Sequence, residues 1–148
     1  LHGNIWYHLG LAYYLKHDYQ KSYEAYLNCR NSGDNDDNIV SSTHWLYMNQ
    51  RRLGNIEMAK KVLEPIKLEV DIIENMSYHQ SCLFYKGLLK ESEIIIDEVA
   101  LYSLANWYVY EKNDTVKAKQ YYQNLLGTGN PYSFAYIAGE ADWVRLFE

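Results

Sequence analysis

The sequence predicts an all-α protein, a right-handed α-solenoid of antiparallel helix hairpins with a capping helix at its C-terminal end. Two observations predict this fold. Apolar residues recur at helical spacing in one segment after another, and short polar turns that carry Asp, Asn or Gly separate these segments into pairs. Sustained alternation of apolar and polar residues and hairpin dipeptides such as Asn-Gly are missing, which argues against a β fold.

The first hairpin is expected over residues 4–36. Apolar residues recur with a helical period over residues 4–16. Asp18 then stands where a short polar side chain would cap a second helix, which runs to about Arg30. A polar segment, residues 32–38, lengthens the connection to the next hairpin.

The second hairpin is expected over residues 40–70 and repeats the same order of features. Its first helix is predicted at 40–53 and its second at 56–66, with Gly54 in the turn and Asn55 as the N-cap.

The third unit, residues 76–97, is degenerate. Its first helix is predicted at 76–89, with Gly87 near the end, whereas the following segment 92–96 is a stunted partner. A small residue is missing from the position where a regular second helix would have one.

The fourth hairpin, residues 99–128, returns to the regular pattern. Its helices are predicted at 99–112 and 115–126, and Asn113 and Asp114 form the turn between them.

A last helix is predicted at residues 131–147. Pro131 suits the first turn of a helix, where its missing N–H would have no helical partner, and the apolar face that follows can close the end of the stack. We expect one domain over residues 1–148. Because the sequence begins at Leu1 without Met and almost directly against the first helix, we also expect a piece of a longer protein.

One motif in the first hairpin identifies the type of repeat. The string Trp-x2-Leu-Gly-x2-Tyr occurs there, and small and aromatic residues follow at matching positions of the second helices. The residues concerned are Trp6, Leu9, Gly10 and Tyr13, then Ser22 and Tyr26, and Ala59 and Ala118 at the small positions of later hairpins. This pattern resembles the tetratricopeptide repeat (TPR) family over nearly the whole chain.

Longer strings narrow the resemblance within that family. The strings are His44-Trp45-Leu46-Tyr47-Met48, Arg51-Arg52-Leu53-Gly54, Val62-Leu63-Glu64-Pro65-Ile66 and Asp71-Ile72-Ile73-Glu74-Asn75, together with Tyr78-His79 and Tyr85-Lys86-Gly87. They look like an uncharacterised group of bacterial TPR proteins. The hairpin order is also similar to that of a bacterial TPR lipoprotein, an adaptor that holds envelope enzymes and a protease.

Composition excludes several classes of partner. The 14 basic and 19 acidic residues give a net charge of −5 at pH 7, and the basic residues are scattered, so we expect no nucleic-acid partner. No apolar run approaches the roughly 18 residues of a membrane span, which predicts a soluble protein without membrane insertion. Cys29 and Cys82 are expected to be buried, reduced thiols.

The polar segment between the first two hairpins raises the question of calcium. Asp34, Asp36 and Asn38 have the alternate spacing that opens an EF-hand loop, but the glycine and the bidentate glutamate of that loop are missing from the matching positions. We therefore expect a solvated turn in which Asp37 or Asn38 caps the next helix.

Catalytic and metal-binding motifs are also missing. The five histidines form no HExxH and no His-x3-His pair, and no nucleophile elbow or phosphate-binding glycine loop can be identified. Tyr78 and His79 come closest to an acid–base pair, although packing and one hydrogen bond explain them as well. We expect no enzyme, no cofactor and no metal.

The resemblance to TPR proteins predicts a binding groove lined by the first helix of each hairpin. In the family's register the concave face would carry aromatic rings and a cationic spot, which suits a protein or peptide partner, and we expect about half of these rings to pack in the core. The predicted groove residues are Tyr7, Leu11, Tyr14, His44, Met48, Arg51, Arg52, Phe84, Tyr85, Trp107 and Tyr110. Further residues in that register are Asn4, Ser77, Ser81 and Ser103. The carboxylate clamp of some TPR domains is not expected, because Tyr7 and Leu11 stand where it requires Lys and Asn.

Three functions fit these features. The first is a TPR-type adaptor or scaffold that binds a peptide or partner segment in the groove. The second is a regulatory domain that senses a peptide or small ligand, and the third is the docking or dimerisation arm of an enzyme that lies outside these residues. The thiol count slightly favours the cytoplasm and the adaptor resemblance permits the periplasm, while the oligomeric state stays open.

Overall fold

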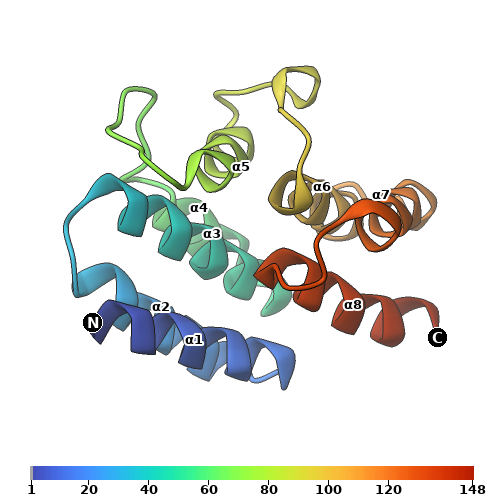
Figure 1. Cartoon of the computed structure of the whole chain (residues 1–148), viewed down its shortest axis with the longest axis horizontal. Helices are drawn as coiled ribbons and strands as arrows, with labels where there is room; N and C mark the ends of the chain where they lie inside the picture. Colours follow the sequence, from blue (N-terminus) through green and yellow to red (C-terminus); the bar gives the residue numbers. More distant parts are fainter. Residues whose placement is uncertain (1) are drawn as a thin grey trace. The chain divides into compact units, whose positions relative to one another are not determined.

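The computed structural model describes residues 2–148, and within them the chain forms eight α-helices, one short 3₁₀ helix and no β-strand (Figure 1). The prediction of an all-α protein is confirmed. The chain divides into two compact units, of which the first ends at Glu93 and the second runs from Ile94 to Glu148.

The first unit contains five α-helices, and α3 lies at its centre. Helix α1 packs against α2, and α3 packs against α2, α4 and α5. The bounds are α1 His2–Leu15, α2 Tyr19–Asn31, α3 Asp36–Arg52, α4 Ile56–Val62 and α5 Met76–Lys86, followed by the 3₁₀ helix η1 Glu91–Glu93.

The second unit contains three helices, each of which packs against the other two. They are α6 Glu98–Tyr110, α7 Thr115–Thr128 and α8 Phe134–Phe147. Helix α8 approaches α7 closely through Gly139, where a Cβ atom would lie only 2.5 Å from Leu125 Cδ2.

Three turns between paired helices share one backbone geometry. In each turn a residue with positive φ directly precedes the N-cap of the second helix: His17 (64°), Gly54 (78°) and Asn113 (54°). Asp18 and Asp114 accept hydrogen bonds from the backbone N–H groups of Lys21 and Lys117, which confirms the N-cap predicted at Asp18. The turn chemistry therefore repeats along the chain together with the helix pattern.

The start of α3 differs from the prediction. Asn35 is the N-cap, its side chain accepting from Asn38 N at 2.8 Å, so the assignment of the cap to Asp37 or Asn38 is wrong. The helix begins a turn before its apolar residues because Asp36 and Asp37 favour the positive end of the helix dipole. Asp37 also accepts hydrogen bonds from the backbone N–H groups of residues 73, 74 and 75, which anchors the segment before α5.

Two helices of the first unit end earlier than predicted. Helix α4 stops at Val62 rather than at Ile66, because a proline at position 65 disfavours helical backbone in the residue before it. Helix α5 stops at Lys86 because Gly87 adopts a left-handed conformation (φ 82°) as the C-cap. In place of the stunted helix 92–96, the chain forms only η1.

Helix α8 starts later than predicted. Pro131 lies in a turn and not in the first helical turn, because Ser133 is the N-cap and its hydroxyl oxygen accepts from Tyr136 N at 3.1 Å. A serine cap two residues beyond the proline thus outweighs the proline as the starting signal.

Gly10 brings α1 and α2 together. A Cβ atom at this position would lie 2.5 Å from the ring of Tyr26, which is fully buried, and the Ser22 hydroxyl donates to the Gly10 carbonyl at 2.7 Å. The small residue of the sequence motif is therefore required by the ring that lies across it.

We predict that Gly10→Ala destabilises the protein by about 1–3 kcal/mol, because the added methyl group must displace Tyr26 from its packing. Gly127→Ala in α7 is the matched control, since nothing lies within 4 Å of its Cβ position, and it should stabilise by about 0.5–1 kcal/mol through helix propensity. Urea unfolding followed by circular dichroism measures both. Equal effects of the two substitutions would contradict the close contact.

Candidate functional site

Trp45 lies at the centre of the first unit and connects three helices. Its side chain is fully buried, and its indole Nε1–H donates to the hydroxyl of Tyr7 on α1 at 2.8 Å. Its ring meets Tyr14 edge to face, with centroids 5.2 Å apart, and stacks on Tyr26 of α2 at 6.0 Å. Aromatic contacts of this kind add to the energy of burial.

A second group of rings joins α3 to α5. Tyr47 and Tyr85 stack with centroids 4.2 Å apart and an interplanar angle of 9°. His44 lies between Trp45 (4.8 Å) and Tyr78 (5.1 Å), and its Nδ1 is 3.3 Å from the Tyr85 hydroxyl. We call these eight residues the aromatic cluster: Tyr7, Tyr14, Tyr26, His44, Trp45, Tyr47, Tyr78 and Tyr85.

The aromatic cluster is electrically neutral. Burial, and then the neighbouring Tyr78, raise the pKa of Tyr7 and of Tyr26 well above the usual value for a phenol. Burial lowers the pKa of His44 to about 3, so its imidazole carries no charge near neutral pH. The hydroxyls of Tyr7 and Tyr78 are joined by a hydrogen bond. The cluster therefore offers rings, hydroxyls and an indole N–H, but no charge.

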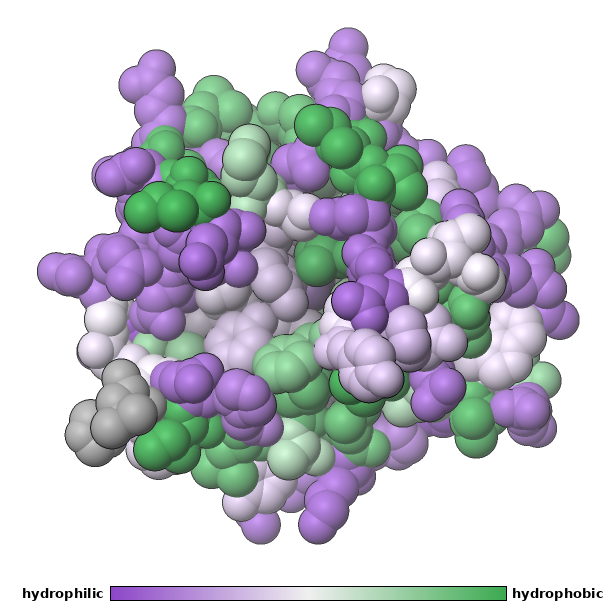
Figure 2. All heavy atoms as spheres, viewed as in Figure 1, coloured by the Kyte–Doolittle hydropathy of each residue, from purple (hydrophilic) through white to green (hydrophobic). Residues whose placement is uncertain are grey.

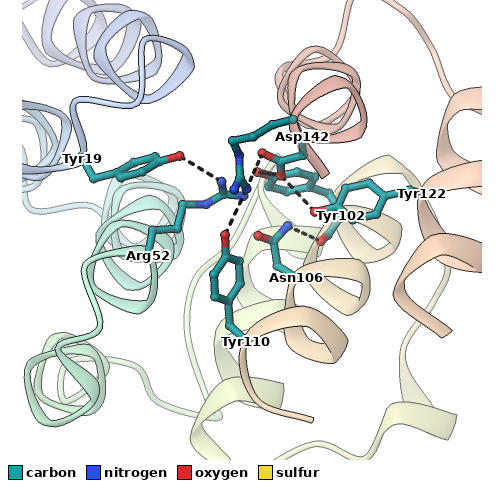
Figure 3. A network of polar contacts seen from close by, with 8 residues as sticks. Tyr19, Arg52, Tyr102, Asn106, Tyr110, Tyr122 and Asp142 are labelled. Carbon is teal, nitrogen blue, oxygen red and sulfur yellow. Dashed lines mark hydrogen bonds and ion pairs between the residues drawn. The ribbon is translucent and has the colours of Figure 1, made fainter. Parts of the chain in front are cut away.

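Two arginines stand at the C-terminal end of α3, beside these rings. The guanidinium of Arg52 lies over Tyr14 at 4.7 Å and Tyr19 at 5.4 Å, and it donates to the Tyr19 hydroxyl at 3.2 Å (Figure 3). The guanidinium of Arg51 lies 6.0 Å from the centroid of Tyr47. Both side chains are half-buried, and their guanidinium groups lie within cation–π distance of these rings.

The predicted groove residues differ widely in exposure. Those on α1, α3 and α5 that are buried are Leu11, Tyr14, His44, Met48, Phe84 and Tyr85. Tyr7, Arg51 and Arg52 are half-buried in the first unit, and Trp107 and Tyr110 are half-buried on α6 of the second unit. Figure 2 shows polar side chains and side chains of intermediate hydropathy next to one another over the first unit.

Four members of the aromatic cluster, Tyr26, Trp45, Tyr47 and Tyr78, are not among the predicted groove residues. Tyr26 belongs to the repeat motif, Trp45 and Tyr47 belong to one of the longer strings, and Tyr78 was considered only as half of an acid–base pair. The aromatic position of the repeat motif was the signal for Tyr26, since an aromatic residue there must pack against the first helix of its own hairpin. No sequence signal pointed from Trp45 to Tyr7.

The second unit contains a buried carboxylate. Oδ2 of Asp142 on α8 accepts hydrogen bonds from the hydroxyls of Tyr102 on α6 (2.8 Å) and Tyr122 on α7 (3.0 Å), as Figure 3 shows. Arg145 lies 3.6 Å from the other carboxylate oxygen and donates to the Tyr110 hydroxyl at 3.1 Å. Every helix of this unit contributes to the network, so Asp142 serves to fix α8 on α6 and α7.

Residues 2–148 show no group of three or more His, Cys, Asp or Glu side chains arranged to hold a metal ion. The acidic residues around the start of α3 line a shallow pocket with Asp71 and Glu74, but Asp36 and Asp37 already accept backbone hydrogen bonds there. Cys29 and Cys82 are unpaired and buried, as predicted.

Comparison with protein-family models, with curated proteins and with solved structures finds no match for this chain. The TPR resemblance therefore stays a prediction. Of the helices within residues 2–148, none is both long enough and apolar enough to cross a membrane.

We predict that Asp142→Asn destabilises the second unit by about 1–3 kcal/mol. The amide preserves the shape of the side chain but weakens the two buried tyrosine hydrogen bonds and removes the ion pair with Arg145. Glu140→Gln, on the exposed side of the same helix, is the control and should change stability by less than about 0.5 kcal/mol. Denaturant unfolding measures both, and an equal effect would argue against the buried network.

Proposed function

We propose that this chain is a TPR-like adaptor module that binds an extended peptide, or a segment of a partner protein, on the faces of α1, α3 and α5. The observation that carries this proposal is the aromatic cluster with Arg51 and Arg52 at one end of it. Rings with polar tips give large contact area at low entropic cost, and arginine adds a planar set of donors.

The repeated turn geometry supports the solenoid part of this proposal. Three helix pairs, α1/α2, α3/α4 and α6/α7, are joined by a residue with positive φ and an Asp or Asn N-cap. Each second helix places a small, fully buried residue near its start: Ser22, Ala59 and Ala118. Repetition of both turn and packing is typical of hairpin repeats.

The chemistry of the proposed site defines the partner. Half-buried Tyr7 and Tyr78 offer ring surface to apolar or aromatic side chains. Arg51 and Arg52 favour a carboxylate at one end of the bound segment. The partner segment is therefore an extended peptide that combines apolar or aromatic residues with an acidic residue.

Selection from a displayed library of random peptides, with the whole chain as bait, tests this function. We expect enrichment of peptides that carry an acidic residue beside aromatic or apolar ones. For the selected peptides, fluorescence anisotropy should show affinity falling about tenfold or more in the double variant Arg51→Gln/Arg52→Gln.

Lys60→Gln/Lys61→Gln is the matched control, because it removes the same charge from exposed positions in the last turn of α4. Its affinity should stay within about twofold of the unaltered chain, since it retains both arginines. Failure to enrich any peptide, or equal losses in the two double variants, would refute the proposed site. Circular dichroism confirms that each variant is folded.

A further inference from the structure

His44 is buried in the contact between α3 and α5. Its side chain is 1% exposed, and its ring lies against the aromatic rings of Trp45 on α3 and of Tyr78 and Tyr85 on α5. The Tyr85 hydroxyl and His44 Nδ1, 3.3 Å apart, share a hydrogen bond whose direction follows the imidazole tautomer. The ring therefore bridges the two helices.

Nothing in this contact balances a positive charge. The titratable groups that face His44 are the hydroxyls of Tyr78 and Tyr85, which are neutral at physiological pH, and no carboxylate contacts the ring among the described residues. A buried imidazolium without an anionic partner is costly, and burial accordingly lowers the pKa of His44 to about 3.

Helix α5 can leave α3 without unwinding another helix if it pivots at residues 73–75, whose backbone Asp37 of α3 holds by hydrogen bonds. The chain before it, residues 63–75, contains no helix, and Gly87 ends the helix in a left-handed conformation. Of the other titratable groups of α5, Cys82 faces α3, whereas His79 and Lys86 contact the chain that precedes α5. Cys82 points to the Val40 carbonyl, His79 Nε2 lies 2.7 Å from the Lys67 carbonyl oxygen, and Lys86 donates to the Ile66 carbonyl.

We propose that the α3–α5 contact is an acid-sensitive joint, in which His44 takes up a proton as α5 separates from α3 and water reaches the imidazole. The separated form then gains population as the pH falls below about 6.5, the pKa of an exposed histidine. The direction of this pH dependence follows from the pKa of His44, which is lower in the closed contact than in the separated form. His44 stabilises the closed contact fully above pH 6.5, and this stability is lost as the pH falls toward the depressed pKa of the closed form.

This joint goes beyond the proposed function and does not depend on it. Separation would carry Tyr78 and Tyr85 away from the aromatic cluster, so any ligand held there would bind less well in acid. The opening itself, however, is a property of the chain alone and is measured without a ligand.

Hydrogen exchange with mass spectrometry on the whole chain at pH 7.5 and pH 5.0 tests the joint. After correction for the intrinsic pH dependence of exchange, the equilibrium constant for opening of α5 should be about 30-fold higher at pH 5.0 than at pH 7.5. This factor follows because pH 5.0 lies about 1.5 units below the pKa of an exposed histidine. Peptides from α1 and α2 should show a smaller change. In His44→Gln and His44→Phe the increase in α5 should vanish, whereas His79→Gln, the matched control on α5, should retain it.

The proposal would be overturned if the exchange of α5 did not depend on pH, or if α1 and α2 showed an equal increase in exchange. It would also be overturned if the increase in α5 persisted in the variants without His44. If neither His44 variant folds, the native NMR signal of His44 decides. Titration of that signal with a midpoint near 6.5 would overturn the proposal. A signal unchanged from pH 7.5 to 5.0, combined with the expected increase of α5 exchange in the unaltered chain, supports it.

Discussion

The first unit depends on the hydrogen bond from the Trp45 indole to the Tyr7 hydroxyl. Trp45 is fully buried, and a buried N–H without a partner would cost about 1–3 kcal/mol. Tyr7 satisfies this donor, which fixes the rotation of α1 about its own axis and turns Tyr14, two turns further along, toward the same indole. The aromatic cluster follows from this one contact.

The same contact explains why small residues are needed nearby. Tyr26 stacks on Trp45 from the other side, and its ring then lies across α1 at Gly10. Ser22, one turn before Tyr26, binds both the Gly10 carbonyl and the Asn49 side chain, so α1, α2 and α3 share a buried polar link. The motif residues and the aromatic cluster are thus parts of one packing arrangement.

Sequence alone predicted the helices and the N-caps Asp18 and Asn55, because helical periodicity and Asp or Asn caps are local signals. Boundaries were wrong where local signals competed, as at the N-terminal end of α8, where the Ser133 cap outweighs Pro131. The site was harder to predict. Residues 40–50 of α3 are buried on every side, so no amphipathic stripe shows which face of the helix meets α1.

The register of the TPR resemblance placed His44 and Met48 in the groove, and the structure buries both. Trp45, the next residue after His44, points to Tyr7 instead. A difference of one residue turns a side chain by about 100° around a helix, and only packing against α1, α2 and α5 settles that rotation. The turns at Asp18, Gly54 and Asn113 could be predicted from the sequence, whereas the orientation of a fully buried helix could not.

Hydrogen exchange of the Trp45 indole N–H, followed by NMR, tests the central contact most directly. If the indole is buried and bonded to Tyr7, its proton should exchange only through opening of the first unit, as slowly as the best protected amides of α3. Exchange at the rate of an exposed indole would contradict the contact and, with it, the aromatic cluster.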